Sequence, residues 1–229
     1  MTAIVIFSRL GSARLPRKAL ADLCGRPMLG RVLDRMRRVQ RCRRIVIATT
    51  ERPQDDEIAA LAQSEGVVAF RGHDADVTKR ALDCCEALRL DRFVRISGDS
   101  PFMPPELIDR ALDLAETEPE ADIVTNVFPR CYPAGASVEV IAAAALRRAY
   151  PRMTGAEREH VTAAFYSHAQ AWRIAKFGTN TGYADVRLTV DTAAELQAAR
   201  ALTARLMPNP ELASLEHVVA LRRALEVTA

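Results

Sequence analysis

Several familiar sequence features are missing from this chain of 229 residues. No apolar run reaches the length of a transmembrane helix, and no segment has the pattern of a signal peptide. Internal repeats, low-complexity tracts and long polar linkers are absent as well. We therefore expect a cytoplasmic protein without a membrane partner, folded as a single domain over residues 1–229.

A strong net charge is also missing. The 32 Lys and Arg residues nearly balance 29 Asp and Glu residues, which leaves a net charge of +3. So weak a balance argues against nucleic acid as a partner. The densest basic stretch, Arg35–Arg38 with Arg41–Arg44, has no interleaved aromatic residues. We expect this stretch to be a solvated helix end, because basic side chains suit helix C-termini.

The cysteines do not have the spacing of a metal site. Cys84 and Cys85 are direct neighbours, which is a poor arrangement for binding one zinc ion. The complete set is Cys24, Cys42, Cys84, Cys85 and Cys131. We expect five reduced thiols.

Apolar strand-like runs alternate with helical patterns along the chain. This order is typical of an α/β protein with a mostly parallel sheet. The expected strands are residues 3–7, 45–48, 67–70, 93–96, 122–126, 172–177 and 187–190. The expected helices are residues 28–39, 53–65, 76–88, 105–116, 142–150, 157–168, 193–206 and 215–227. Between them, Pro and Gly residues interrupt the pattern over about residues 128–141, which we expect to form an arm.

A cationic loop follows the first apolar run, Ala3–Phe7. Its cations are Arg9, Arg14, Arg17 and Lys18, and they surround the single Gly11. Ligands of α/β proteins bind outside the carboxyl ends of the strands, and crowded cations favour an anionic ligand. The loop therefore predicts a polyphosphate site, although an ordinary solvated basic loop is the simpler alternative.

The loop does not match the common glycine-rich phosphate motifs. A P-loop has a second glycine directly before its lysine, and a dinucleotide fingerprint has three glycines, whereas this loop has only Gly11. Backbone amides alone therefore cannot hold the anion. The Arg and Lys side chains must supply more of the binding.

Two aspartates follow predicted strands. Asp99 lies in the polar turn Ser97–Phe102, and Asp191 ends the run 187–191. Carboxylates that face a phosphate loop suggest Mg²⁺, which binds one or two carboxylates together with substrate phosphates. Asp is also a preferred helix N-cap, and for Asp191 that reading stays open. No helix follows Asp99 immediately, which favours the metal reading there.

These motifs together resemble the sugar-acid cytidylyltransferases, closest to the spore-coat polysaccharide type and related to the acylneuraminate and 3-deoxy-manno-octulosonate cytidylyltransferases. The matching segments are residues 8–18, 45–50, 68–72, 94–101, 132–135 with 138–140, 157–161 and 187–192. The resemblance implies a three-layer α/β/α nucleotide-diphosphosugar transferase fold with a mostly parallel mixed sheet. It also implies a Mg²⁺-dependent reaction of CTP with a sugar-acid acceptor that releases pyrophosphate, and a homodimer that uses the arm.

The resemblance also implies roles for individual residues. Lys18 and Arg14 match the catalytic triphosphate-binding pair, and Asp99 and Asp191 match the catalytic metal-binding aspartates. The implied nucleotide-binding residues are Ser8, Arg9, Gly11, Ser12, Arg14, Lys18, Arg71, Ser97 and Asp99. The implied substrate-binding residues are Tyr132, Glu139, Arg158, His160 and Arg187.

The sequence departs from the family pattern at Arg17, where the family usually has glycine before the lysine. Arg17 either adds a cation or crowds the triphosphate. Two other functions stay open: a catalytically silent nucleotide-binding homologue, if Arg17 crowds the triphosphate, and, independently of Arg17, a glycosyltransferase that uses a nucleotide sugar. Nucleotide-sugar glycosyltransferases typically carry an Asp-x-Asp metal motif. This chain has only the single Asp99 at that place, which argues against a glycosyltransferase.

Overall fold

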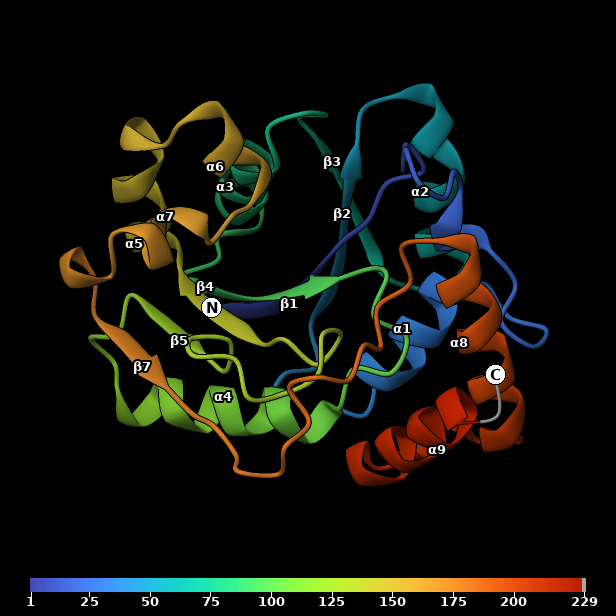
Figure 1. Ribbon diagram of the computed structural model, residues 1–229. Coiled ribbons are helices and arrows are strands. Elements are labelled where there is room, and N and C mark those ends of the chain that lie inside the picture. The colour runs from blue at the N-terminus through green and yellow to red at the C-terminus, as the bar shows by residue number, and fades with distance from the viewer. Residues whose placement is uncertain (228–229) are drawn as a thin grey trace.

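A seven-stranded sheet runs through the computed structural model, which describes residues 1–227 (Figure 1). The strand order is β3-β2-β1-β4-β6-β5-β7. The strands are β1 (Thr2–Phe7), β2 (Ile45–Thr50), β3 (Val68–Gly72), β4 (Arg92–Ser97), β5 (Ile123–Thr125), β6 (Glu139–Ala142) and β7 (Ile174–Lys176). Within this sheet β6 runs antiparallel to both neighbours, and the other pairs are parallel. The predicted mostly parallel mixed sheet is confirmed.

Helices cover both faces of the sheet, which confirms the three-layer α/β/α fold (Figure 1). One core includes residues of α1 (Met28–Met36), α2 (Asp56–Ser64), α4 (Pro105–Thr117), α8 (Ala193–Leu206) and α9 (Leu215–Val227). The opposite face carries α3 (Val77–Leu88), α5 (Ala143–Ala149), α6 (Gly155–Glu159) and α7 (Ala163–Ser167). Short 3₁₀ turns are η1 (Lys18–Leu20), η2 (Pro53–Asp55), η3 (Tyr150–Arg152), η4 (Ala169–Ala171) and η5 (Pro210–Leu212).

The central strand β1 is apolar throughout because both its faces are buried. Ile4 and Ile6 point into one core, and Ala3 and Val5 point into the other. In the parallel pairing of β1 with β4, Phe7 lies opposite Ser97. The loop after β1 and the turn after β4 therefore leave the same edge of the sheet side by side.

The predicted helix over 157–168 is wrong, because the chain forms two shorter helices there. Thr154 starts α6 with a capping box that includes Glu157. Helix α6 ends at His160, whose backbone has φ −123° and ψ 87°. The next residue, Val161, is fully buried in the core beside α7. Burying Val161 takes the chain out of helical geometry for several residues.

The predicted strand over 187–190 is also wrong. Val186, Leu188 and Val190 are buried while Arg187 and Thr189 are more exposed, which is the alternation of a strand. The segment nevertheless has only a single parallel bridge, between Ala134 and Arg187. Its amides bond to a loop and a turn instead of to a continuous strand.

The expectation of a solvated basic helix end fails at Arg35, which is 1% exposed. Its guanidinium donates to the carbonyls of Met103 at 2.7 Å, Pro210 at 2.9 Å and Ala213 at 2.9 Å. Burial lowers the pKa of Arg35 to about 10, so the group stays charged at neutral pH. Arg35 therefore ties α1 to the segment before α4 and to η5.

Residues 128–138 lie outside the sheet and pack against the same chain, but residues 139–141 belong to strand β6, so the predicted arm over 128–141 extends too far. Pro129 and Arg130 are exposed, whereas Tyr132 is 5% exposed and Ala136 is fully buried. The Asn126 side chain fixes the base of this segment by bonding to the backbone of residues 136 and 138. Only the tip of the segment is therefore exposed to solvent.

None of the helices in residues 1–227 combines the length and apolar character needed to cross a membrane. The five cysteines are all free thiols in the structure, as predicted.

Candidate active site

A cleft of about 430 Å³ opens at the carboxyl ends of β1 and β4. Its lining comes mainly from the loop after β1, the end of β4, the first turn of α3 and the end of α6. The lining residues are Phe7, Ser8, Arg9, Gly11, Ser12, Ala13, Arg14, Lys18, Ala19, Val77, Arg80, Arg95, Ser97, Gly98, Asp99, Glu159, His160 and Asp191. Most residues that the sequence predicted for the catalytic and nucleotide-binding sets are among them.

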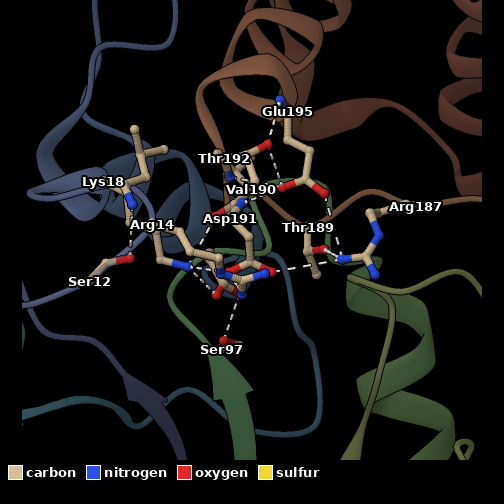
Figure 2. A network of polar contacts seen from close by, with 12 residues as sticks. Ser12, Arg14, Lys18, Ser97, Arg187, Thr189, Val190, Asp191, Thr192 and Glu195 are labelled. Atoms are coloured by element: carbon tan, nitrogen blue, oxygen red, sulfur yellow. Dashed lines mark hydrogen bonds and ion pairs between the residues drawn. The ribbon is translucent and has the colours of Figure 1, made fainter.

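Lys18 lies between the two predicted metal-binding aspartates, in the network that Figure 2 shows. Its Nζ is 2.7 Å from Asp99 Oδ2 and 2.8 Å from Asp191 Oδ1, and it also donates to the carbonyl of Val190 at 3.1 Å. The three charged side chains are only 14%, 19% and 20% exposed. The fold thus gathers one cation and two acids that are 81 and 173 positions from the lysine.

The electrostatic environment keeps Lys18 and Asp191 charged. Burial alone lowers the pKa of Lys18, but Asp99 and Asp191 outweigh that effect and raise it above its ordinary value. Burial alone raises the pKa of Asp191, but the hydrogen bond and charge of Lys18 outweigh it, so this pKa lies below its ordinary value. An ammonium and a carboxylate therefore face each other across the neutral pH range.

The turn after β4 holds Asp99 in a fixed orientation. Ser97 donates its hydroxyl to Asp99 Oδ1 at 2.7 Å. At Gly98 an added Cβ would lie 2.8 Å from the Cβ of Ser8 and 3.1 Å from the carbonyl oxygen of Phe7. Only glycine fits this close approach of the two segments. The missing side chain lets Asp99 lie directly beside the basic loop.

Asp191 is held from the other side, at the beginning of α8. The N-cap of α8 is Thr192, whose hydroxyl accepts from the amide of Glu195 at 3.2 Å. Glu195 in return accepts from the amides of Asp191 at 2.8 Å and Thr192 at 2.9 Å. The capping alternative for Asp191 is therefore wrong, and its carboxylate is available to the cleft.

Further arginines surround the acids. Arg14, which is 67% exposed, places Nη2 3.2 Å from Asp191 Oδ1. Arg187 lies outside the cleft lining, with Nη1 3.8 Å from Asp191 Oδ2 and 3.6 Å from Glu195 Oε1 (Figure 2). Arg9 donates to the carbonyl of Asp74 at 3.3 Å. These arginines give the mouth of the cleft a positive charge that suits an anion.

The basic loop is anchored by a buried carboxylate that the sequence analysis missed. Asp55 has no exposed surface, and it accepts from the amide of Leu10 at 2.7 Å and from the hydroxyl of Thr50. In the sequence, Asp55 looked only like the acidic start of a helix. No signal in the pattern indicated that it supports the loop.

Arg17 does not enter the cleft. Its backbone φ of 61° lies in the left-handed region, which explains why glycine suits this position. Its guanidinium pairs with both oxygens of Glu57, at 2.8 and 2.7 Å. The side chain therefore points to α2, and it neither crowds the basic loop nor adds a cation to the cleft lining.

Arg71, which was predicted to bind the nucleotide, lies outside the cleft lining. It extends from β3 and donates Nε to the carbonyl of Thr50 at 3.0 Å, and Nη1 is 2.6 Å from Asp56 Oδ1. These contacts join the end of β3 to β2 and α2. The side chain is already committed to them.

The predicted substrate-binding residues are divided between several places. His160 lines the cleft. Tyr132 is 5% exposed and accepts from Arg110, and Arg158 places its guanidinium over the ring of Tyr150, 4.6 Å from the centroid. Glu139 is 3% exposed and lies outside the cleft lining, where it accepts from Arg95, a residue that does line the cleft. Of the predicted substrate-binding residues, His160 is the one that lines the same cleft as the basic loop.

Two arginines that the sequence analysis missed line the cleft. Arg80 is 2% exposed and donates to the carbonyls of His73 and Asp74, both at 3.0 Å. Burial lowers the pKa of Arg80 to about 10. Arg95 comes from the middle of β4. A charged residue inside an apolar strand was the one sequence signal that could have indicated Arg95.

The two aspartates fit a divalent cation. Residues 1–227 contain no group of three or more His, Cys, Asp or Glu side chains that would bind a metal alone. Asp99 and Asp191 nevertheless converge on one point, which Lys18 Nζ reaches. Magnesium takes one or two carboxylates and fills its other positions with water and phosphate oxygens. A pair of acids beside a cationic loop matches that requirement.

The fold and the cleft define an α/β protein with a basic, acid-containing cleft at the carboxyl ends of its strands. A family model described as cytidylyltransferase matches residues 3–216. The chain belongs to this cytidylyltransferase family, and it is a CTP-dependent nucleotidyltransferase.

Individual proteins agree with this assignment. The chain is 29% identical over 228 residues to the spore coat polysaccharide biosynthesis protein SpsF of Bacillus subtilis, covering 96% of this chain and 93% of that protein. It is 38% identical over 128 residues to the 3-deoxy-manno-octulosonate cytidylyltransferase of Chlorobium phaeobacteroides, covering 55% of this chain and 50% of that protein. The structure of a cytidylyltransferase from Leptospira borgpetersenii superposes with a TM-score of 0.92 at 24% identity, covering 99% and 95% of the two chains. This last likeness shows the shared fold.

Proposed function

We propose that this protein transfers CMP from CTP to a sugar or sugar acid, with Mg²⁺ as cofactor and pyrophosphate as the second product. The reaction would serve the biosynthesis of a surface polysaccharide or another glycan. The observation that carries this proposal is Lys18 Nζ, held at 2.7 and 2.8 Å from Asp99 and Asp191 beside a loop rich in cations. A nucleotide triphosphate needs such a combination of positive charge and metal-binding carboxylates.

In this proposal the triphosphate binds along the basic loop. Arg14 and Lys18 contact its phosphates, and the nearby residues Ser8, Arg9, Gly11 and Ser12, all of which line the cleft, complete the nucleotide site. Ser97 and Asp99 close it from the end of β4. Arg71 stays a predicted nucleotide-binding residue; it lies outside the cleft lining, and its partners in the structure are Thr50 and Asp56.

Asp99 and Asp191 hold the magnesium ion in this proposal. The ion supplies charge neutralisation and polarisation at the α-phosphate. Lys18 then shares its three N–H donors between the acids and a phosphate oxygen, which replaces the carbonyl of Val190. These shared contacts keep the Lys18 ammonium close to the negative charge that develops during transfer.

The transfer itself needs positioning more than a protein nucleophile. A hydroxyl of the acceptor attacks the α-phosphorus, and the bond to pyrophosphate breaks. Lys18 and Arg14 stabilise the negative charge that grows on the leaving pyrophosphate. His160, which lines the cleft, contacts the acceptor sugar.

Pyrophosphate release from each of the four nucleoside triphosphates, measured across a panel of sugar acids, tests this function. We expect release with CTP and one class of sugar acid, and loss of release when EDTA removes the divalent cation. Release of a nucleoside mono- or diphosphate from a nucleotide sugar would instead indicate a glycosyltransferase. Binding of CTP without pyrophosphate from any acceptor would indicate a silent homologue.

The remaining proposals concern the whole protein. We propose that it works in the cytoplasm, where nucleotides are available, as one catalytic domain over residues 1–229. We also propose a homodimer in which residues 128–141 contact the second subunit. The exposed tip at Pro129 and Arg130 supports this assembly.

A further inference from the structure

A row of polar residues crosses the sheet below the cleft. Arg95 on β4 pairs directly with Glu139 on β6, and Glu139 pairs with Thr125 on β5. Neighbours two positions along the strands on the same face, Phe93 and Ile141, belong to the apolar core. Charged residues at this depth are expensive unless they are paired, so the row calls for a specific explanation.

Both oxygens of the Glu139 carboxylate are bonded. Oε2 accepts from Arg95 Nη1 at 2.7 Å, and Oε1 accepts from the hydroxyl of Tyr166 at 2.6 Å. Thr125 Oγ1 lies 2.9 Å from the same tyrosine hydroxyl. Burial and the Glu139 carboxylate raise the pKa of Tyr166, so the phenol keeps its proton and donates. Glu139, at 3% exposure, is therefore fixed from behind and holds Arg95 in one orientation.

The pairing with Glu139 occupies only some of the N–H donors of Arg95. Its side chain is 26% exposed and lines the cleft. Within residues 1–227 its hydrogen-bond partner is Glu139, and its buried Nε has none. A guanidinium has five N–H donors, so most of them remain for a ligand or water. Arg95, which lies on strand β4, therefore presents N–H groups to the cleft that have no partner in the described part of the protein.

The position of Arg95 relative to the reacting centre suits an acceptor. Arg95 precedes Ser97 by two residues on β4, on the same face, and Ser97 bonds to Asp99. Two residues along a strand span about 7 Å. A sugar acid is long enough to place a hydroxyl near Asp99 and an anionic group near Arg95. His160 and Glu159 line the same cleft, and His160 is a predicted acceptor residue.

We propose that Arg95 binds an anionic group of the acceptor, a carboxylate or a phosphate, and thereby selects charged acceptors over neutral ones. Glu139 is a positioning residue that acts through Arg95 and does not touch the acceptor. This inference rests on the proposed function of the cleft. A neutral acceptor leaves the remaining guanidinium donors unpaired, and a site built to bond a polar group rejects analogues that lack it.

Matched acceptor pairs test the inference by calorimetry on the full chain with CTP, using Ca²⁺ in place of Mg²⁺ to suppress turnover. The pairs are gluconate with glucitol and glucose 6-phosphate with glucose, and 3-deoxy-manno-octulosonate serves as a longer sugar acid. We expect at least one anion to bind about 10- to 100-fold more tightly than its neutral counterpart, as charge-assisted hydrogen bonds do. The gluconate and glucose 6-phosphate results decide between a carboxylate and a phosphate.

Variants then assign the preference to Arg95. Arg95→Gln is expected to remove the preference for the anion while the Kd for CTP changes less than threefold. Glu139→Gln is expected to reduce the preference partly, because Arg95 remains but loses its fixed orientation. Arg173→Gln, at an exposed surface ion pair with Glu120, is the matched control and keeps the preference.

Two results overturn the inference. One is an Arg95→Gln variant that binds CTP and keeps the full anion preference. The other is a wild-type protein that binds CTP but prefers no anion over its neutral counterpart. Failure of the proposed function looks different, because the wild type then fails to bind CTP or to release pyrophosphate with any acceptor.

Discussion

Lys18 makes two ion pairs at once, with Asp99 and Asp191, and these pairs determine how substitutions at the three residues act. The two carboxylates carry one charge more than the ammonium can balance, and Arg14 lies 3.2 Å from Asp191 to offset part of the excess. Removing Lys18 leaves two partly buried carboxylates without their ammonium, which is costly, whereas removing one acid leaves Lys18 paired with the other. Substitutions here therefore act on binding and turnover through electrostatics.

Asp99→Asn and Lys18→Ala are each expected to lower kcat about 100-fold or more, because single charge-stabilising groups contribute about 3–4 kcal/mol to the transition state. Initial rates of pyrophosphate release from CTP measure the effect, with circular dichroism to confirm folding. Arg17→Gln is the neighbouring control and should keep turnover within about threefold, because Arg17 pairs with Glu57 outside the cleft. Near-normal turnover of Asp99→Asn contradicts the assignment.

The lowered pKa of Asp191 predicts a pH dependence of stability. Because this pKa lies below the ordinary value of 3.8, its stabilising contribution is complete above that value and is lost as the pH falls through the lowered pKa. Urea unfolding of the wild type and of Asp191→Asn between pH 7 and about pH 3 measures it. The wild type should lose more free energy of unfolding than the variant. Equal losses would show that the ion pair with Lys18 does not stabilise the protein.

Single residues differed in how well the sequence predicted them. Lys18, Asp99 and Asp191 were found because they follow apolar runs, so their place at one edge of the sheet could be inferred. Asp55 and Arg95 were missed because their roles depend on which backbone amide or carboxylate lies opposite them in the fold. Such pairings are set by strand register and loop closure, which a single sequence does not display.

Helix α8 positions Asp191 through its first turn. The capping box formed by Thr192 and Glu195 binds the amides of residues 191, 192 and 195. Arg187 adds a weaker contact with Glu195 from the preceding segment. The beginning of one helix thus orients a carboxylate in the cleft.

Thr192→Ala is expected to lower the free energy of unfolding by about 1 kcal/mol, the usual cost of losing an N-cap. It should also lower turnover severalfold, because the backbone at Asp191 loses part of its support. Urea denaturation and pyrophosphate release measure the two effects. Ser214→Ala removes a comparable hydroxyl contact at α9, where Ser214 accepts from the amide of His217, and should leave turnover unchanged. If Thr192→Ala also keeps full turnover, the cap does not position Asp191.

At the scale of elements, local signals predicted those helices whose ends are set by the chain itself. The bounds 193–206 and 215–227 match α8 and α9, since Thr192 caps the first and Pro208 and Pro210 separate the two. The strand over 187–190 failed because no neighbouring strand extends beside it. The helix over 157–168 failed because Val161 is drawn into the core. Local patterns cannot show either kind of tertiary partner.

For the whole molecule, the main expectation is self-association. We expect a homodimer at micromolar concentration, because twofold pairs are the commonest oligomers and residues 128–141 expose Pro129 and Arg130 at their tip. Sedimentation velocity measures the state directly. Arg130→Glu should shift the protein towards monomer without unfolding it, since the Arg130 side chain is exposed and donates to Ser137 at the surface. A wild type that sediments as a monomer contradicts this assembly.

The partners of Lys18 have a consequence for how the protein is made. Synthesis produces the basic loop first, the turn that carries Asp99 after 81 further positions, and Asp191 only after 173. Until Asp191 has left the ribosome, Lys18 of the nascent chain lacks one of its two acidic partners. Nucleotide affinity should appear only after Asp191 has left the ribosome, which makes CTP binding a reporter of that late folding step.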